Sequence, residues 1–148
     1  MNRKLEHYYL QSTTINIKEA KLLIRLASYF GVNSILIGNT LKNTLGPIMR
    51  LHTSNCKNVN TITEEQYDLI LIDSSELVRS KSLLNKLIDA MHNDSILILR
   101  NIYVQSENET LWRSLHNHKA FNVSIDLYTH GLLFIRKEQV KEHFVIRW

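Results

Sequence analysis

Apolar residues follow two patterns along the chain. They form short uninterrupted runs, and between these runs they recur at helical spacing. The clearest run, Leu69–Ile72, is entered through polar residues and stops at Asp73. Because no polar residue interrupts it, this run predicts a strand covered on both faces, as in a parallel sheet between helices. In such a sheet the functional crevice lies at the carboxyl ends of the strands, so we expect Asp73 to lie beside it.

Other segments extend this sheet. Residues 34–38 and 95–99 have the same apolar character, and we expect a short strand at 59–62. Residues 121–127 alternate apolar and polar side chains, which predicts a strand with one exposed face. This strand and residues 132–136 are expected to form a hairpin at the antiparallel edge of the sheet.

Helical stripes occupy the intervals between these strands. Three such stripes run over residues 20–30, 77–91 and 106–115. Asn16 and Glu19 have the spacing of a capping box before the first stripe, which we expect to end at Gly31. Ser106 and Glu109 repeat that spacing before the third. We expect residues 74–76, before the second stripe, to form a loop.

This order of elements predicts an α/β fold. The expected architecture is a Rossmann-like three-layer sandwich with a mostly parallel sheet, a C-terminal antiparallel hairpin and a reduced number of strands. The length of 148 residues suits a single domain over residues 1–148. Residues 1–15 are polar with an aromatic cluster and are expected to form an N-terminal arm.

Composition limits the kinds of binding partner and the cellular compartment that we expect for this protein. The net charge of +4 is spread among acidic residues, so we expect no nucleic-acid partner. No apolar stretch approaches membrane-spanning length and the start has no signal-peptide core, so we expect no membrane association. The single cysteine, Cys56, cannot form an internal disulfide, which makes a cytoplasmic location the default expectation.

The segment after the first strand is a candidate ligand cradle. A strand that ends at Gly38 and continues through Asn39 and Thr40 toward a helix has the layout of a nucleotide or cofactor site, because glycine lets the backbone approach a ligand. Gly46–Pro47 interrupts the following helix, which we expect to begin again at Pro47. The alternative is that Gly38 only terminates a strand.

Three later segments carry a family resemblance. Residues 93–99, 123–128 and above all 131–144, with Arg-Lys-Glu-Gln followed by Lys-Glu-His-Phe, resemble the C-terminal half of class I S-adenosylmethionine-dependent methyltransferases. The similarity is to the small-molecule O-methyltransferases of Bacteroides-type bacteria and extends from about residue 17 to the end. It implies a Rossmann-like sheet and an ancestral S-adenosylmethionine site, in which Gly38, Asn39, Thr40 and Asp73 would contact the cofactor.

Several positions depart from the pattern that this family implies. Leu36 stands where the family has an acidic residue before its first glycine, and Lys42 replaces a later glycine. The interval between Gly38 and Asp68 is too short for two further strand–helix units, and it offers no acid at the end of a strand to hold a ribose. Arg100 occupies a place where metal-dependent relatives carry a carboxylate, and a guanidinium repels a metal ion, so we expect no metal.

Two further residues or segments have competing interpretations. Asp73 could contact a cofactor, but we favour a role in capping a helix or pairing with Arg100. Residues 144–148 either form an edge that pairs with another chain or pack on their own sheet.

We therefore expect a methyltransferase-like pseudoenzyme that acts by binding a protein partner or by forming a homodimer, and we assign no catalytic residue. The alternative is an active, metal-independent S-adenosylmethionine-dependent methyltransferase that acts on a small molecule. A signalling receiver domain is rejected, because the segment after the first strand lacks an acidic pair and Arg100 stands where a receiver needs a lysine.

Overall fold

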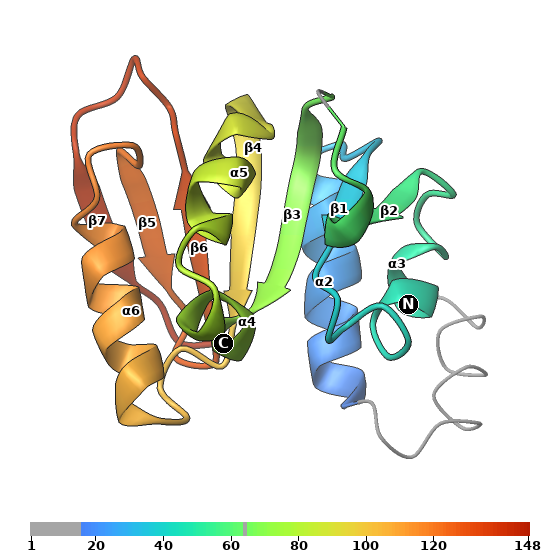
Figure 1. Ribbon diagram of the computed structural model, residues 1–148, viewed down its shortest axis with the longest axis horizontal. Coiled ribbons are helices and arrows are strands. Elements are labelled where there is room, and N and C mark those ends of the chain that lie inside the picture. The colour runs from blue at the N-terminus through green and yellow to red at the C-terminus, as the bar shows by residue number, and fades with distance from the viewer. Residues whose placement is uncertain (1–15, 64) are drawn as a thin grey trace.

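The computed structural model describes residues 16–63 and 65–148, so the expected N-terminal arm, residues 1–15, lies outside the described residues. Within the described ranges, seven strands form one sheet in the order β2-β1-β3-β4-β6-β5-β7 (Figure 1). The strands are β1 (Ile35–Ile37), β2 (Cys56–Asn58), β3 (Tyr67–Asp73), β4 (Met91–Arg100), β5 (Val123–Asp126), β6 (His130–Phe134) and β7 (Glu142–Val145).

Helices cover both faces of this sheet. They are α2 (Ile17–Tyr29), α3 (Gly46–Met49), α4 (Ser74–Arg79), α5 (Leu83–Asp89) and α6 (Ser106–His116), with a short 3₁₀ helix, η1 (Val59–Thr61). One apolar core joins α2 and α3 to the sheet, and a second joins α4, α5 and α6 to the opposite face. This confirms the predicted Rossmann-like sandwich. None of the helices in the described part of the chain is long and apolar enough to cross a membrane.

The sheet is mostly parallel, as predicted. Strand β3 pairs in parallel with β1 and β4, and only β6 runs antiparallel to its neighbours. Both faces of β3 are covered, so Leu69–Ile72 is fully buried. In the described part of the interval between β1 and β3, the elements are α3, β2 and η1, which is less than two full strand–helix units, as its length predicts.

Two expectations about the strands were wrong. Residues 59–61 form η1 rather than a strand, because the Asn58 side chain accepts the Asn60 amide at 2.9 Å and ends β2 at that point. The β5–β6 hairpin is not the edge of the sheet either. Strand β6 lies between β4 and β5, and β7 pairs in parallel with β5 to form the edge. The final segment therefore packs on its own sheet.

The polar face of β5 is also covered, contrary to expectation. Ser124 and Asp126 are buried, whereas Val123 and Ile125 are half-buried. The polar side chains can be buried because they are hydrogen-bonded beneath α6: Ser124 Oγ lies 2.6 Å from a ring nitrogen of His143, and the Asp126 carboxylate accepts the indole N–H of Trp112.

Helix boundaries differ from the predicted stripes in three places. Residues 77–91 form parts of α4, α5 and the start of β4 rather than one helix, and the expected loop at 74–76 is the first turn of α4. Asn16 caps α2 as predicted, but Glu19 does not complete the capping box, because its carboxylate is bonded elsewhere. Ser106 is the first residue of α6 rather than its cap, and the Gln105 side chain caps nothing there.

Candidate functional site

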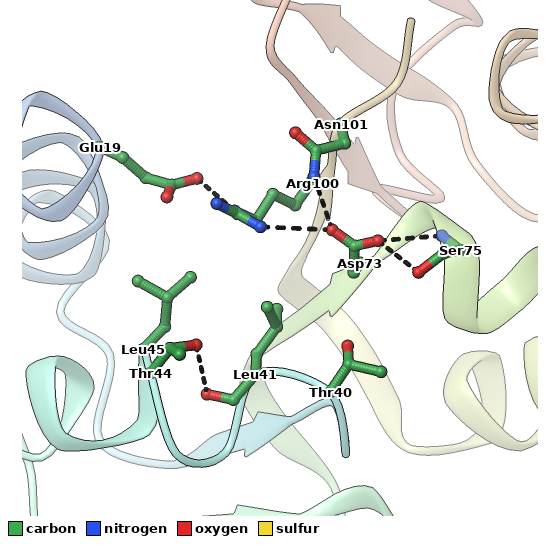
Figure 2. Close-up of a pocket in the computed structure, with 9 residues that line it drawn as sticks. All are labelled: Glu19, Thr40, Leu41, Thr44, Leu45, Asp73, Ser75, Arg100 and Asn101. Carbon is green, nitrogen blue, oxygen red and sulfur yellow. Dashed lines mark hydrogen bonds and ion pairs between the residues drawn. The ribbon is translucent and has the colours of Figure 1, made fainter. Parts of the chain in front are cut away.

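The candidate site lies at the carboxyl ends of the parallel strands, where β1 and β3 are neighbours. From β1 the chain proceeds outward to β2 and then returns to β3 on the other side, so this is the point at which strand order reverses and where ligands bind in open α/β sheets. A cavity of about 360 Å³ opens there (Figure 2). Its walls are formed by Glu19, Thr40, Leu41, Thr44, Leu45, Asp73, Ser75, Arg100 and Asn101.

Asp73, at the end of β3, is held by partners on both carboxylate oxygens. Its Oδ2 accepts hydrogen bonds from the Ser75 backbone N–H at 3.1 Å and from the Ser75 hydroxyl at 2.6 Å, which caps α4. Its Oδ1 accepts from Asn101 Nδ2 at 2.8 Å and faces the Arg100 guanidinium at 3.5 Å. Both favoured interpretations of Asp73, as a helix cap and as the partner of Arg100, are confirmed.

Arg100, at the end of β4, lies between two carboxylates (Figure 2). Its Nε donates to Glu19 Oε2 at 2.6 Å, and the His130 ring nitrogen Nε2 lies 2.6 Å from the same oxygen. Glu19 and His130 are almost fully buried, with 6% and 2% of their surfaces exposed. The cluster therefore joins α2, β4 and β6 through hydrogen bonds to one buried carboxylate.

The electrostatics of this cluster favour the charged forms. Burial alone would raise the pKa of Glu19, but hydrogen bonds from His130 and Arg100 outweigh it, so the pKa of Glu19 is lowered from its ordinary value. Burial likewise opposes the charge on Arg100, and the carboxylates of Glu19 and Asp73 still raise the pKa of the guanidinium. The guanidinium stays positively charged beside the cavity.

The Gly38 loop is bound by a residue of the chain itself. The Glu76 carboxylate, on α4, accepts the backbone N–H groups of Asn39 and Thr40, each at 3.1 Å, and the Thr40 hydroxyl at 3.2 Å. A Cβ atom on Gly38 would lie 3.0 Å from a Glu76 oxygen and 3.1 Å from the Ile72 side chain. Gly38 is therefore required for the close approach of the loop to β3 and α4.

A second cavity of about 540 Å³ lies beside Glu76 and is lined in part by Asn39, Val59, Asn60 and Ile62. The Asn60 side chain donates to Asn39 Oδ1 at 3.0 Å. Strand β2 ends at Asn58, so the chain presents an amide and no carboxylate at this strand end. Leu36, where the resemblance implies an acid, is fully buried in the core.

The predicted site residues thus come together only in part. Thr40 lines both cavities, Asp73 lines the first, Asn39 lines the second, and Gly38 lines neither. Within residues 16–63 and 65–148, no group of three or more histidine, cysteine or acidic side chains is placed to hold a metal.

Sequence reasoning missed Glu19, Glu76 and His130. For Glu19 a signal was available, because a carboxylate at position 19 falls on the same buried face of α2 as Ala20, Leu23 and Ala27. A charge on the apolar face of an amphipathic helix indicates a buried partner. The role of Glu76 had no such local signal, because an acid in the first turn of a helix is ordinary.

Comparison with known proteins supports the fold. No protein-family model matches the sequence, and no curated protein matches it. Among solved structures, the chain is similar to the cofactor-bound protein Rv0187 from MTB, with a TM-score of 0.65, 12% identity, and coverage of 83% of this chain and 82% of that one. It is also similar to the O-methyltransferase from Bacillus cereus in complex with SAH, with a TM-score of 0.58, 10% identity and 90% coverage of both chains. The chain has the fold of class I methyltransferases.

Proposed function

We propose that this protein is a methyltransferase-fold pseudoenzyme that does not transfer methyl groups and acts by binding a partner. The observation that carries the proposal is the Glu76 carboxylate on the amides of Asn39 and Thr40. Backbone N–H groups of such a loop are the donors with which α/β folds hold anionic groups of a cofactor. Here they are already engaged by a charged acceptor, which makes a strong hydrogen bond.

The other parts of the site support the same conclusion. In the pattern that the resemblance implies, an acid near the first strand helps to hold the ammonium group of the cofactor, and that position is the buried Leu36. The nearby carboxylates of Glu19 and Asp73 are both paired with Arg100. The residues present therefore do not fit S-adenosylmethionine in the way the family resemblance implies. A binding role in the cytoplasm is the function we propose.

Calorimetric titration with S-adenosylmethionine and S-adenosylhomocysteine tests this proposal. We expect no heat of binding for the wild-type protein or for Glu109→Gln, a control that removes an exposed carboxylate of α6. A micromolar Kd, which corresponds to about 8 kcal/mol, would show that the proposal is wrong. Glu76→Gln tests whether the Glu76 carboxylate is the cause. If this variant, with its reduced charge, binds the cofactor and the wild type does not, the Glu76 carboxylate is what excludes the cofactor.

A second candidate function is supported by the cavity beside Asp73. Its volume of about 360 Å³ and its lining by Thr40 and Asp73 are compatible with an active, metal-independent S-adenosylmethionine-dependent methyltransferase for a small molecule. This function requires that cofactor binding is measurable and that Asp73→Ala weakens it or abolishes methyl transfer. The same titration therefore separates the two candidates before any acceptor is screened.

A further inference from the structure

The edge strand β7 leaves its outer backbone groups without a neighbouring strand. The backbone N–H groups of Glu142 and Ile146 donate to carbonyls of Asn122 and Asp126 in the β5 segment, each at 2.8 Å. Alternate residues of a strand direct their N–H and C=O groups to opposite sides, so Phe144 also faces β5 and the residues on either side of it face away. His143 and Val145 therefore present backbone donors and acceptors on the outer side of β7, beyond which no described strand lies.

This edge is exposed, and its second half is apolar. All four residues of β7 are exposed, and Phe144, Val145 and Ile146 form a consecutive apolar run with exposed fractions of 43%, 58% and 48%. Natural sheets normally protect an edge by making it short or by placing lysine or proline on it. The preceding Lys141 does not protect this edge, because its ammonium group donates to the carbonyls of His118 and Phe121.

The opposite edge of the sheet shows the usual protection. Strand β2 has only three residues, and its central residue is Lys57, which forms an ion pair with Glu65 at 3.0 Å. The two short edges of the sheet differ in composition: β2 carries a lysine at its centre, whereas β7 ends in the apolar residues Phe144 and Val145.

We propose that a second copy of this chain pairs with β7, antiparallel about a two-fold axis at Val145, so that one sheet continues through both copies. The proposal goes beyond the proposed function and does not depend on whether a cofactor binds. In this register the outward groups of Val145 meet those of the Val145 of the other copy, and Phe144 lies opposite Ile146.

Side-chain directions make this register self-complementary. The His143 side chain reaches Ser124 beneath α6, so Val145, two residues on, shares that face and Phe144 and Ile146 lie on the other. The register then forms a continuous apolar row of Phe144 and Ile146 side chains across both copies. Centring the pair on Phe144 instead would place Glu142 opposite Ile146, which interrupts this apolar row with a carboxylate.

Sedimentation over a concentration series, with a matched pair of variants, tests the pairing. We expect the wild type to reach twice the 17.4 kDa mass of one chain. Val145→Lys places two ammonium groups opposite each other at the axis and should weaken the dimer about tenfold or more. Val140→Lys makes the same change at an equally apolar, more exposed position outside β7 and should leave the dimer intact.

Hydrogen exchange on the wild type tests the pairing without any substitution. The amides of His143 and Val145 should exchange more slowly as protein concentration rises, whereas those of Phe144 and Ile146, which face β5, should change little. Far-UV circular dichroism verifies that Val145→Lys is folded. A wild type that stays monomeric at all concentrations overturns the proposal, as does a dimer in which exchange at His143 and Val145 is independent of concentration. Neither result bears on cofactor binding.

Discussion

The two halves of the sheet, on either side of β3, are held together by different means. The half formed by β4, β6 and β5 is fixed by tight packing and buried charges: Trp112 lies directly on Gly131, and Glu19 connects α2 to Arg100 and His130. In the other half β1 and β2 have three residues each, and the loop after β1 adds polar contacts with Glu76 and Asn60 to the burial of Leu41 and Leu45.

The positions at which the sequence departs from the methyltransferase resemblance are accommodated in different ways. Lys42 is exposed, whereas Leu36 is fully buried in the core. At Arg100 the positive charge is balanced by two carboxylates that the fold brings to it.

Removal of the Glu19 carboxylate should have the largest effect on stability. Glu19→Ala leaves the buried His130 and the guanidinium of Arg100 without their shared partner, which we expect to cost about 3–5 kcal/mol of the free energy of unfolding. Chemical denaturation measures the change. Glu109→Ala, which breaks an exposed i,i+4 pair with Arg113, is the control and should cost only about 0.5 kcal/mol. Equal losses for the two variants would contradict the buried role of Glu19.

Gly131→Ala tests the packed half in a second way. A Cβ at Gly131 would lie 2.3 Å from the buried Trp112 ring, whose movement is restricted by the core around it. We expect a loss of about 1–3 kcal/mol from overpacking. Gly46→Ala, in the other half, meets only the flexible end of Arg50 at 3.3 Å and should change stability much less. Thermal melts of both variants measure these changes. A larger loss of stability for Gly46→Ala than for Gly131→Ala would contradict this prediction.

The strands could be predicted wherever both faces are buried. The segments 34–38, 69–72 and 95–99 lie within two residues of β1, β3 and the core of β4, because burial on both faces requires an unbroken apolar run. The first part of β4 was missed since His92, Asn93 and Asp94 are polar and only half-buried or exposed. The break between α4 and α5 was also not predicted, because both helices contribute to one apolar stripe.

The candidate site was predictable only where a residue's own position determines its role. Asp73 follows a buried strand and precedes a helix, so its capping role could be inferred locally. The contact between Glu19 and His130 spans 111 positions, and that between Glu76 and the Gly38 loop spans 36 or 37. Such pairs are set by the tertiary fold, and no local pattern specifies them.

The pH dependence of stability tests whether Glu19 stabilises the fold in its charged form. Its pKa is lowered in the folded state from an ordinary value of 4.5, so the folded state binds fewer protons than the unfolded state in acid. The stabilisation by Glu19 is therefore complete above pH 4.5 and is lost as the pH falls through the lowered pKa. The difference in unfolding free energy between wild type and Glu19→Gln should shrink with acidification below pH 4.5. A difference that grows in that range would contradict this assignment.

The smallest effect is expected at the Gly38 loop, where Glu76→Gln removes a charge but keeps a hydrogen-bond acceptor. The exposed amides of Asn39 and Thr40 then lose a charge-assisted partner, for which we expect a loss of at most about 1 kcal/mol. Hydrogen exchange is the more sensitive measurement, because these two amides should exchange faster while those of β3 remain protected. Glu109→Gln should change neither. If the two loop amides are unaffected by Glu76→Gln, the loop is held by packing like the rest of the sheet, and the contrast between the two halves does not hold.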